Sequence, residues 1–258
     1  MYYEIHGLAA ADAPVLVLSS GLGGSANFWQ SQLPALTKKY CVLIYDHSGT
    51  GRSPAELAHD YSIASMASEL IALLDELHIA QCHIIGHALG GLVALHIAAS
   101  SPERVISMVL VNAWSSPNPH TTRCFNIRLA ILDNCSHSVY LQTQALILYP
   151  PDWIVGNIQT LEKEEQHLLA NFPDKTNLLA RINALSQFNI DDKLASLTVN
   201  TLVIANKDDI LVPWQRSQWL ADSLPHATLV LFDYGGHACS VTTPTDFNNT
   251  LLKHLETF

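Results

Sequence analysis

The stretch IIGHALGG, residues 84–91, decides the fold of this chain. It continues a short apolar run that begins at Cys82, and it leads directly into residues 89–99, which are rich in glycine and alanine and apolar nearly all round. Such a run is typical of a strand covered on both faces of a parallel sheet, and the segment after it of a buried crossover helix. The stretch therefore predicts a strand, a tight turn at Ala88 and a helix.

The same alternation continues along the chain. Short apolar runs predict buried strands, and apolar residues at helical spacing predict the helices between them. The predicted strands are residues 15–19, 42–45, 82–85, 108–111, 201–205 and 228–232, and the predicted helices are residues 63–77, 89–99, 214–223 and 245–255. We expect an α/β fold with a mostly parallel central sheet flanked by helices.

The middle of the chain differs from both ends. Residues 115–194 show little strand pattern, and their helical stretches are broken by prolines, namely Pro117, Pro119, Pro150, Pro151 and Pro173. A helical block between two strand–helix runs predicts an insertion in one domain. We therefore expect a core made of residues 1–114 and 195–258, with residues 115–194 as an inserted helical cap.

Composition narrows the class of partner and the compartment. The formal net charge of −10 argues against nucleic acid and anionic membranes as partners, because both need clustered Lys and Arg. The first ten residues lack the basic and apolar regions of a signal peptide, and no apolar run is long enough to cross a bilayer. Five cysteines without a C-x-x-C pair predict free thiols. We expect a cytoplasmic protein.

Residues that follow buried strands are candidates for a site, because ligands bind beyond the carboxyl ends of the strands in an open parallel sheet. The first such loop, SSGLGGSANFW (residues 19–29), has three glycines that let the backbone approach a ligand and aim N–H groups at it. The next, DHSGTGRS (residues 46–53), is rich in turn residues, and a structural role is the better interpretation.

Two late strands are followed by titratable side chains. NKDDILVP (residues 206–213) offers Asp208 and Asp209, and YGGHA (residues 234–238) presents His237 on a Gly-Gly turn. Along the chain, a strand–turn–helix at Ala88 is followed by an acid and then by a histidine, the last two each just past a late strand. This is the order in which a nucleophile elbow is followed by its acid and its histidine. The backbone N–H groups of Leu89 and Leu22 are expected to form an oxyanion hole, which stabilises charge on a carbonyl oxygen.

These features resemble the α/β-hydrolase fold family. The spacing to Pro213 makes Asp209 a better match than Asp208 to the family's acid. The first-loop dipeptide of the family is usually His-Gly, whereas this chain has Ser20-Gly21, a departure that leaves the backbone donor intact.

A narrower resemblance is to the RutD family, α/β-hydrolase-fold proteins of the bacterial Rut pathway, which degrades uracil and releases its nitrogen. It is carried by GHALGG, HTTRCF (residues 120–125), LYPPDW (residues 148–153), NLLARINAL (residues 177–185) and DYGGHACSVT (residues 233–242). The elbow of that family also carries alanine. The resemblance implies a hydrolase of aminoacrylate or carbamate, which are small products of ring opening in pyrimidine catabolism.

Alanine at the apex restricts the chemistry, because a methyl group cannot attack a carbonyl. Cys239 and Ser20 do not lie on the turn that aims a nucleophile, so packing and turn roles are expected for both. What remains is His237, oriented by Asp209, beside a space that could hold a water. His87 adjoins the apex and is either a second acid or base or a side chain that only props the elbow.

Both substrates implied by the resemblance are anions, so the site should contain a cation or aimed N–H groups. Arg123, Arg128 and Arg181 lie in the predicted cap, although each alone is more typical of a surface charge. We expect a small anionic substrate and neither a cofactor nor a metal, and we leave a homodimer open. The rival hypotheses are a non-catalytic protein that binds an intermediate or a pathway enzyme, and an esterase with an unexpected nucleophile.

Overall fold

A seven-stranded sheet forms the centre of the molecule. The computed structural model describes all residues, 1–258, and orders the strands β1-β3-β2-β4-β5-β6-β7. β1 runs antiparallel to β3, and every other neighbouring pair is parallel. The strands are β1 (Tyr3–Gly7), β2 (Val15–Ser19), β3 (Cys41–Tyr45), β4 (Cys82–His87), β5 (Val105–Val111), β6 (Asn200–Asn206) and β7 (Ala227–Phe232).

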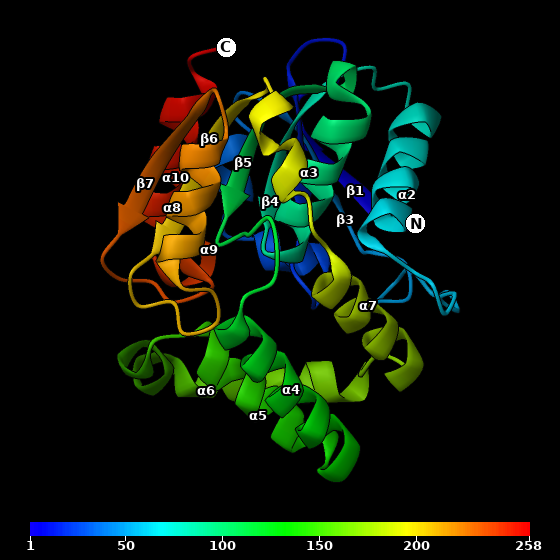
Figure 1. Cartoon of the computed structure of the whole chain (residues 1–258), viewed down its shortest axis with the longest axis vertical. Helices are drawn as coiled ribbons and strands as arrows, with labels where there is room; N and C mark the ends of the chain where they lie inside the picture. Colours follow the sequence, from blue (N-terminus) through cyan, green and yellow to red (C-terminus); the bar gives the residue numbers. More distant parts are fainter.

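Helices cover both faces of this sheet and one of its ends (Figure 1). α2, α3 and α8 pack on one face around a large apolar cluster, while α1 and α10 pack on the other around a second cluster. The α-helices are α1 (Leu33–Leu36), α2 (Ile63–Glu76), α3 (Leu89–Ser100), α4 (Pro119–Asn134), α5 (His137–Leu148), α6 (Pro151–Ala170), α7 (Lys175–Gln187), α8 (Trp214–Ser223), α9 (Cys239–Thr242) and α10 (Pro244–Leu255). Three 3-10 turns are η1 (Ala26–Trp29), η2 (Pro102–Arg104) and η3 (Asp191–Ser196).

The predicted fold class is confirmed, and a strand forms at each of the six predicted runs. Five of these strands are buried, whereas β7 is mostly half-exposed because it pairs with β6 alone at an edge of the sheet. The sequence pattern did not reveal β1. This strand has only five residues, is mostly half-exposed and pairs with one neighbour along an edge of the sheet. It therefore lacks the continuous apolar run that marks a strand buried on both faces.

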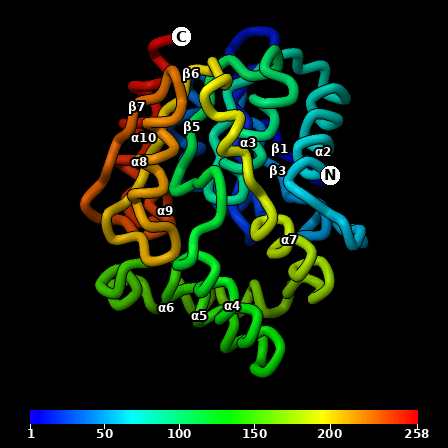
Figure 2. The backbone as a smooth tube through the Cα atoms, viewed as in Figure 1, coloured from blue at the N-terminus to red at the C-terminus, as the bar shows by residue number.

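Four helices, α4 to α7, lie between β5 and β6 in the chain, and we call them the cap helices. Figure 2 shows the chain leaving the sheet after β5, forming α4, α5 and α6 below the sheet, and returning through α7. Two of the prolines that interrupt the sequence pattern, Pro119 and Pro151, stand in the first turn of α4 and α6, where proline is tolerated because its missing N–H has no helical partner. The division of the chain into core and cap domains stays a prediction.

Close packing of α3 on the sheet explains two of the glycines around the elbow. A Cβ at Gly90 would lie 2.1 Å from the Ser19 carbonyl oxygen, and one at Gly86 would lie 2.3 Å from the Gly90 carbonyl oxygen. Both positions therefore exclude any side chain. No helix of the structure combines the length and the apolar character that crossing a membrane requires.

Candidate active site

Ala88 forms the apex of a strained turn between β4 and α3. Its backbone has φ 47° and ψ −111°, a conformation that residues other than glycine rarely adopt. The Ala88 N–H donates to the Val111 carbonyl at 2.9 Å, which ties the turn to the end of β5. The Ala88 residue is buried, with 6% of its surface exposed. This strand–strained turn–helix geometry is that of a nucleophile elbow.

Two backbone N–H groups beside the apex have no acceptor within the protein. They belong to Leu89, the first residue of α3, and to Leu22 in the loop after β2. The two segments meet at Gly21, where a Cβ would lie 3.6 Å from Ala88 Cβ. Free donors at a helix N-terminus and in an adjoining loop can stabilise charge on a substrate oxygen.

His237 and Asp209 form a buried hydrogen-bonded pair. The Nδ1–H of His237 donates to Asp209 Oδ2 at 2.7 Å, and both side chains are almost wholly buried. Asp209 Oδ1 accepts the N–H groups of Leu211 and Val212 at 2.8 and 2.9 Å, which fixes the carboxylate. Because the pair holds the proton on Nδ1, the Nε2 lone pair of His237 stays free to take a proton.

Asp208 serves the same loop in a different way. Its two carboxylate oxygens accept the N–H groups of Gly235 and Gly236 at 3.0 and 2.9 Å. Asp208 thus holds the Gly-Gly turn that presents His237, while Asp209 contacts the imidazole. Of the two carboxylates, Asp209 is therefore the one in contact with His237, and its role as the acid stays a prediction.

His87 contacts the loop that carries His237 (residues 234–238). Its Nε2–H donates to the His237 carbonyl at 2.8 Å, and its ring stacks on Phe28 with 4.6 Å between centroids. Burial, and then the nearby His237, lower the pKa of His87 to about 3, so the ring is neutral near pH 7. A neutral ring cannot act as an imidazolium acid, and the geometry favours the supporting role over that of an acid.

Asn112 is a site residue that the sequence reasoning missed. It directly follows β5 with φ 48°, and its side-chain N–H groups donate to the carbonyl oxygens of His237 and Gly236 at 2.8 and 3.3 Å and to Asn206 Oδ1 at 3.2 Å. Asn206, at the end of β6, in turn donates to the Tyr234 carbonyl at 2.9 Å. One feature of the sequence could have identified both residues: each is a polar residue at the end of an apolar strand run.

The three candidate arginines lie in different places. Arg123 is exposed on α4. Arg128 is buried within the cap helices, where it donates to the Tyr140 hydroxyl and to Gln144 Oε1. Arg181, on α7, is buried against the first loop and donates to the Gly21 carbonyl at 3.4 Å. Of the three, Arg181 is the one that contacts the loop after β2, which holds Gly21 and Leu22.

The two alternative nucleophiles, Cys239 and Ser20, do not lie on the turn at Ala88. Cys239 is buried, and burial raises the pKa of its thiol, which disfavours the reactive thiolate. Ser20 is buried one residue before Gly21. No three His, Cys, Asp or Glu side chains gather closely enough to hold a metal ion.

The chain is similar to known proteins of one fold family. The family model for the alpha/beta hydrolase fold matches residues 14–135. A protein of Pseudomonas savastanoi pv. phaseolicola is 57% identical over 255 residues, with 99% of this chain and 98% of the relative covered. A protein of Agrobacterium fabrum is 42% identical over 255 residues, with the same shares covered. Both relatives carry the name "Putative carbamate hydrolase RutD".

The chain belongs to the RutD family of α/β-hydrolase-fold proteins. Solved structures agree with the fold of the family. A hydrolase from Pseudomonas aeruginosa PA01 superposes with a TM-score of 0.88 at 27% identity, covering 98% of this chain and 93% of the other. The enol-lactonase from Burkholderia xenovorans LB400 superposes with a TM-score of 0.90 at 23% identity, covering 99% and 96%, a likeness of fold alone.

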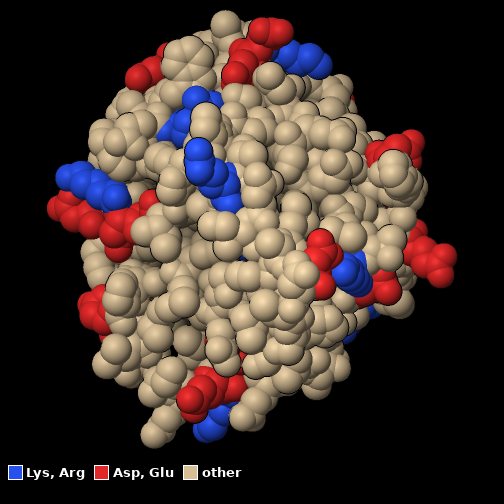
Figure 3. All heavy atoms as spheres, turned by 60° about the horizontal axis from the view of Figure 1, so that its bottom comes forward, with Lys and Arg blue, Asp and Glu red and all other residues tan.

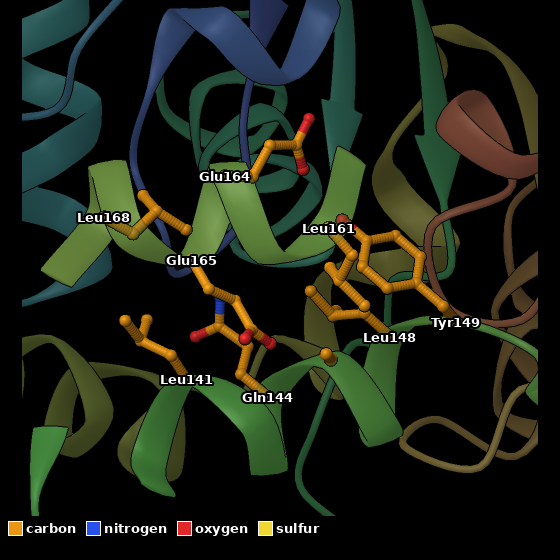
Figure 4. A pocket seen from close by; sticks show the side chains of 9 residues that line it. Leu141, Gln144, Leu148, Tyr149, Leu161, Glu164, Glu165 and Leu168 are labelled. Carbon is orange, nitrogen blue, oxygen red and sulfur yellow. The ribbon is translucent and has the colours of Figure 1, made fainter. Parts of the chain in front are cut away.

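Two hollows of this RutD-family chain lie away from the apex. A cavity of about 30 Å³ lies between α5 and α6 in the cap, where Gln144 and Glu165 face each other while Glu164 leaves α6 on the opposite side (Figure 4). This volume suits a water rather than a substrate. A wider surface hollow of about 390 Å³ lies between α2 and α3. Figure 3 shows charged side chains in separate small groups on the face that carries the cap.

Proposed function

We propose that this chain is a hydrolase that releases ammonia from a small C–N compound of pyrimidine catabolism, either carbamate or aminoacrylate. His237 and Asp209 activate water, and no serine nucleophile takes part. One observation carries the proposal: the buried 2.7 Å pair of His237 and Asp209 is kept beside an elbow whose apex is alanine. The name of the RutD relatives, "Putative carbamate hydrolase RutD", supports the class of substrate.

The reaction needs no covalent enzyme intermediate. Water attacks the carbon that carries the nitrogen, and His237 Nε2 takes a proton from that water. The same nitrogen then gives the proton to the departing amine; the C–N bond breaks, its electron pair stays on nitrogen, and ammonia leaves. Carbamate and water thus become bicarbonate and ammonia. Aminoacrylate first tautomerises to an imine, which water converts to a carbonyl compound and ammonia.

The remaining residues have supporting roles. The N–H groups of Leu22 and Leu89 hold a substrate oxygen, and Asp209 stabilises the imidazolium while His237 carries the extra proton. Such acid–base help contributes roughly 10²–10⁴-fold. That range is sufficient for substrates that also break down in water without an enzyme.

The test measures ammonia release from freshly prepared carbamate and aminoacrylate with the full-length chain. We expect acceleration over the buffer rate, and we expect His237→Ala to lose at least about a hundredfold of it. Asp209→Asn should lose most of the gain, because the tautomer and orientation of His237 change. The matched control is His167→Ala, since His167 is exposed on α6, and it should keep the full rate.

A second candidate is a non-catalytic protein that binds a pathway intermediate, which the alanine at the apex favours. A wild-type rate equal to that of buffer for both substrates would refute the hydrolase and leave the binding protein. Labelling of the wild type by a fluorophosphonate probe would instead indicate an esterase with an unexpected nucleophile.

A further inference from the structure

The loop after β2 forms a tight turn against the guanidinium of Arg181. The Gly24 N–H donates to the Gly21 carbonyl at 2.9 Å, which closes a turn over residues 21–24. Arg181, on the cap helix α7, donates from Nη2 to the same carbonyl at 3.4 Å and from Nη1 to Thr50 Oγ1. A Cβ on Gly24 would lie 2.6 Å from Arg181 Nη1. The guanidinium therefore contacts both ends of the turn.

The contact with the Gly21 carbonyl fixes the direction of the Leu22 N–H. The two groups belong to one peptide unit, whose planar trans geometry points the C=O and the N–H to opposite sides. The carbonyl faces Arg181, so the N–H points away from the guanidinium, and it has no acceptor within the protein. A Cβ on Gly21 would lie 3.6 Å from Ala88 Cβ, so this peptide unit lies beside the elbow.

The loop after β3 holds the preceding peptide unit in the same way. The Nε2–H of His47 donates to the Ser20 carbonyl at 3.2 Å, and the backbone N–H of His47 donates to the Gly24 carbonyl at 2.9 Å. Burial lowers the pKa of His47 to about 3, so its ring adds no positive charge beside the turn near pH 7. Two successive carbonyls, those of Ser20 and Gly21, thus each accept from a buried side chain.

Arg181 brings a buried charge to this turn without a counter-charge. None of the ion pairs in the structure includes it. Burial lowers the pKa of Arg181 to about 10, which leaves the group charged at neutral pH. A buried charge without an opposite one costs stability, and folds keep such costs mainly at functional sites. The charge also polarises the peptide unit whose carbonyl it contacts, and a polarised unit is a stronger donor at its N–H.

We propose that Arg181 is a positioning residue for the oxyanion hole. It holds the Gly21 carbonyl so that the Leu22 N–H is aimed at the substrate oxygen, and its charge strengthens that N–H as a donor. The cap helix α7 therefore has to be docked on the core for this donor to be in place. The inference rests on the proposed function, because the donor matters to catalysis only if charge develops on a substrate oxygen beside Ala88.

Nuclear magnetic resonance on the full-length chain tests the contact without any substrate. A hydrogen bond moves the signal of a carbonyl carbon downfield, so Arg181→Met should move the Gly21 carbonyl signal upfield and shift the Leu22 amide signal. Arg123→Met, on the exposed face of α4, is the control and should leave both signals in place. Unchanged Gly21 and Leu22 signals in Arg181→Met would overturn the proposal.

Turnover separates the aiming of a donor from a clamp that only stabilises the fold. Arg181→Met should lower kcat for ammonia release by about tenfold to a hundredfold per folded molecule, with KM little changed, because an oxyanion donor acts in the transition state. Arg181→Lys keeps the charge without the planar fork and should recover part of the rate. A raised KM at unchanged kcat would overturn the positioning role, and no recovery in Arg181→Lys would overturn the role of the charge.

Thr50→Val covers the case in which Arg181→Met does not fold. It removes the hydroxyl that accepts from Arg181 Nη1, nearly keeps the shape of the side chain and leaves the charge in place. The Gly21 and Leu22 signals should shift in the same directions as in Arg181→Met, by less, and unchanged signals would count against the proposal.

The positioning role and the proposed function can fail separately. If the Gly21 and Leu22 signals shift as expected while the wild type does not accelerate ammonia release, the hydrolase fails and the hold of Arg181 on the peptide unit stands. If the wild type accelerates the reaction and Arg181→Met keeps the full rate, the hydrolase stands and the positioning role fails.

Discussion

At the scale of single residues, Ala88 combines a strained backbone with a side chain that has no reactive group. A sparsely populated conformation such as its φ of 47° costs on the order of 1–3 kcal/mol, so the surrounding structure has to impose it. The hydrogen bond from Ala88 N–H to Val111 and the glycines at 86 and 90 do so here. The elbow is therefore built by its neighbours and does not depend on serine.

Restoring a hydroxyl at the apex tests this geometry directly. Ala88→Ser should give a chain that a fluorophosphonate probe labels, because in the proposed site His237 Nε2 would activate the serine and the Leu22 and Leu89 N–H groups would stabilise the adduct. Labelling is read by intact-protein mass spectrometry. The wild type and the double variant Ala88→Ser/His237→Ala are the controls, and neither should be labelled. An unlabelled Ala88→Ser chain would mean that His237 does not face the apex.

At the scale of elements, segments far apart in sequence hold the loops that carry His237 and Asp209. The ends of β4 and β5 supply His87 and Asn112, which both donate to the His237 carbonyl at 2.8 Å. The cap helices contribute as well. The Leu148 carbonyl, at the end of α5, accepts the N–H of Ala238, next to His237, at 3.1 Å. Thr121 Oγ1 of α4 donates to the carbonyl of Leu211, two residues after Asp209, at 3.1 Å. The position of the His–Asp pair therefore depends on both core and cap.

Removing the Asn112 side chain should loosen the histidine loop. Asn112→Gly keeps the backbone at its φ of 48° without strain and deletes the donors to the His237 carbonyl. The hydrogen bond that positions His237 is worth about 1–1.5 kcal/mol. Its loss corresponds to about a tenfold lower kcat, with KM little changed. The low-field NMR signal of the His237 Nδ1–H proton should broaden at the same time. Asn126→Gly, exposed on α4, should change neither, and an intact signal in Asn112→Gly would contradict the positioning role.

At the scale of the whole molecule, burial keeps the imidazole rings of His47 and His87 neutral. Desolvation, and then the nearby Arg181, lower the pKa of His47 to about 3, and desolvation followed by His237 lowers that of His87 to about 3. The unfolded chain, with ordinary imidazoles near 6.5, binds more protons than the native state between these values. Stability must then rise with pH across this window and be lost as the pH falls from 6.5 toward 3.

The free energy of unfolding, measured by urea titration at pH 7 and pH 5, should show this loss. Each fully buried imidazole contributes up to about 1.4 kcal/mol per pH unit. The glutamine of His47→Gln can still donate to the Ser20 carbonyl, as His47 does at 3.2 Å. The variant should take up about one proton fewer on unfolding, so its free energy of unfolding should depend less steeply on pH. His59→Gln, at an exposed position, should leave the slope unchanged, and an equal slope in all three proteins would contradict the buried neutral state of His47.

The sequence by itself determined the alternation of strands and helices, the elbow at Ala88 and the order of Asp209 and His237, because local periodicity, turn glycines and position after a strand are properties of short segments. The tertiary structure decided the rest. The Asn112 and His87 contacts to His237 span 125 and 150 residues, and the contact of Arg181 with Gly21 spans 160. Pairings at such separations, and the burial that keeps His87 neutral, arise only when distant segments pack together, so no local pattern encodes them.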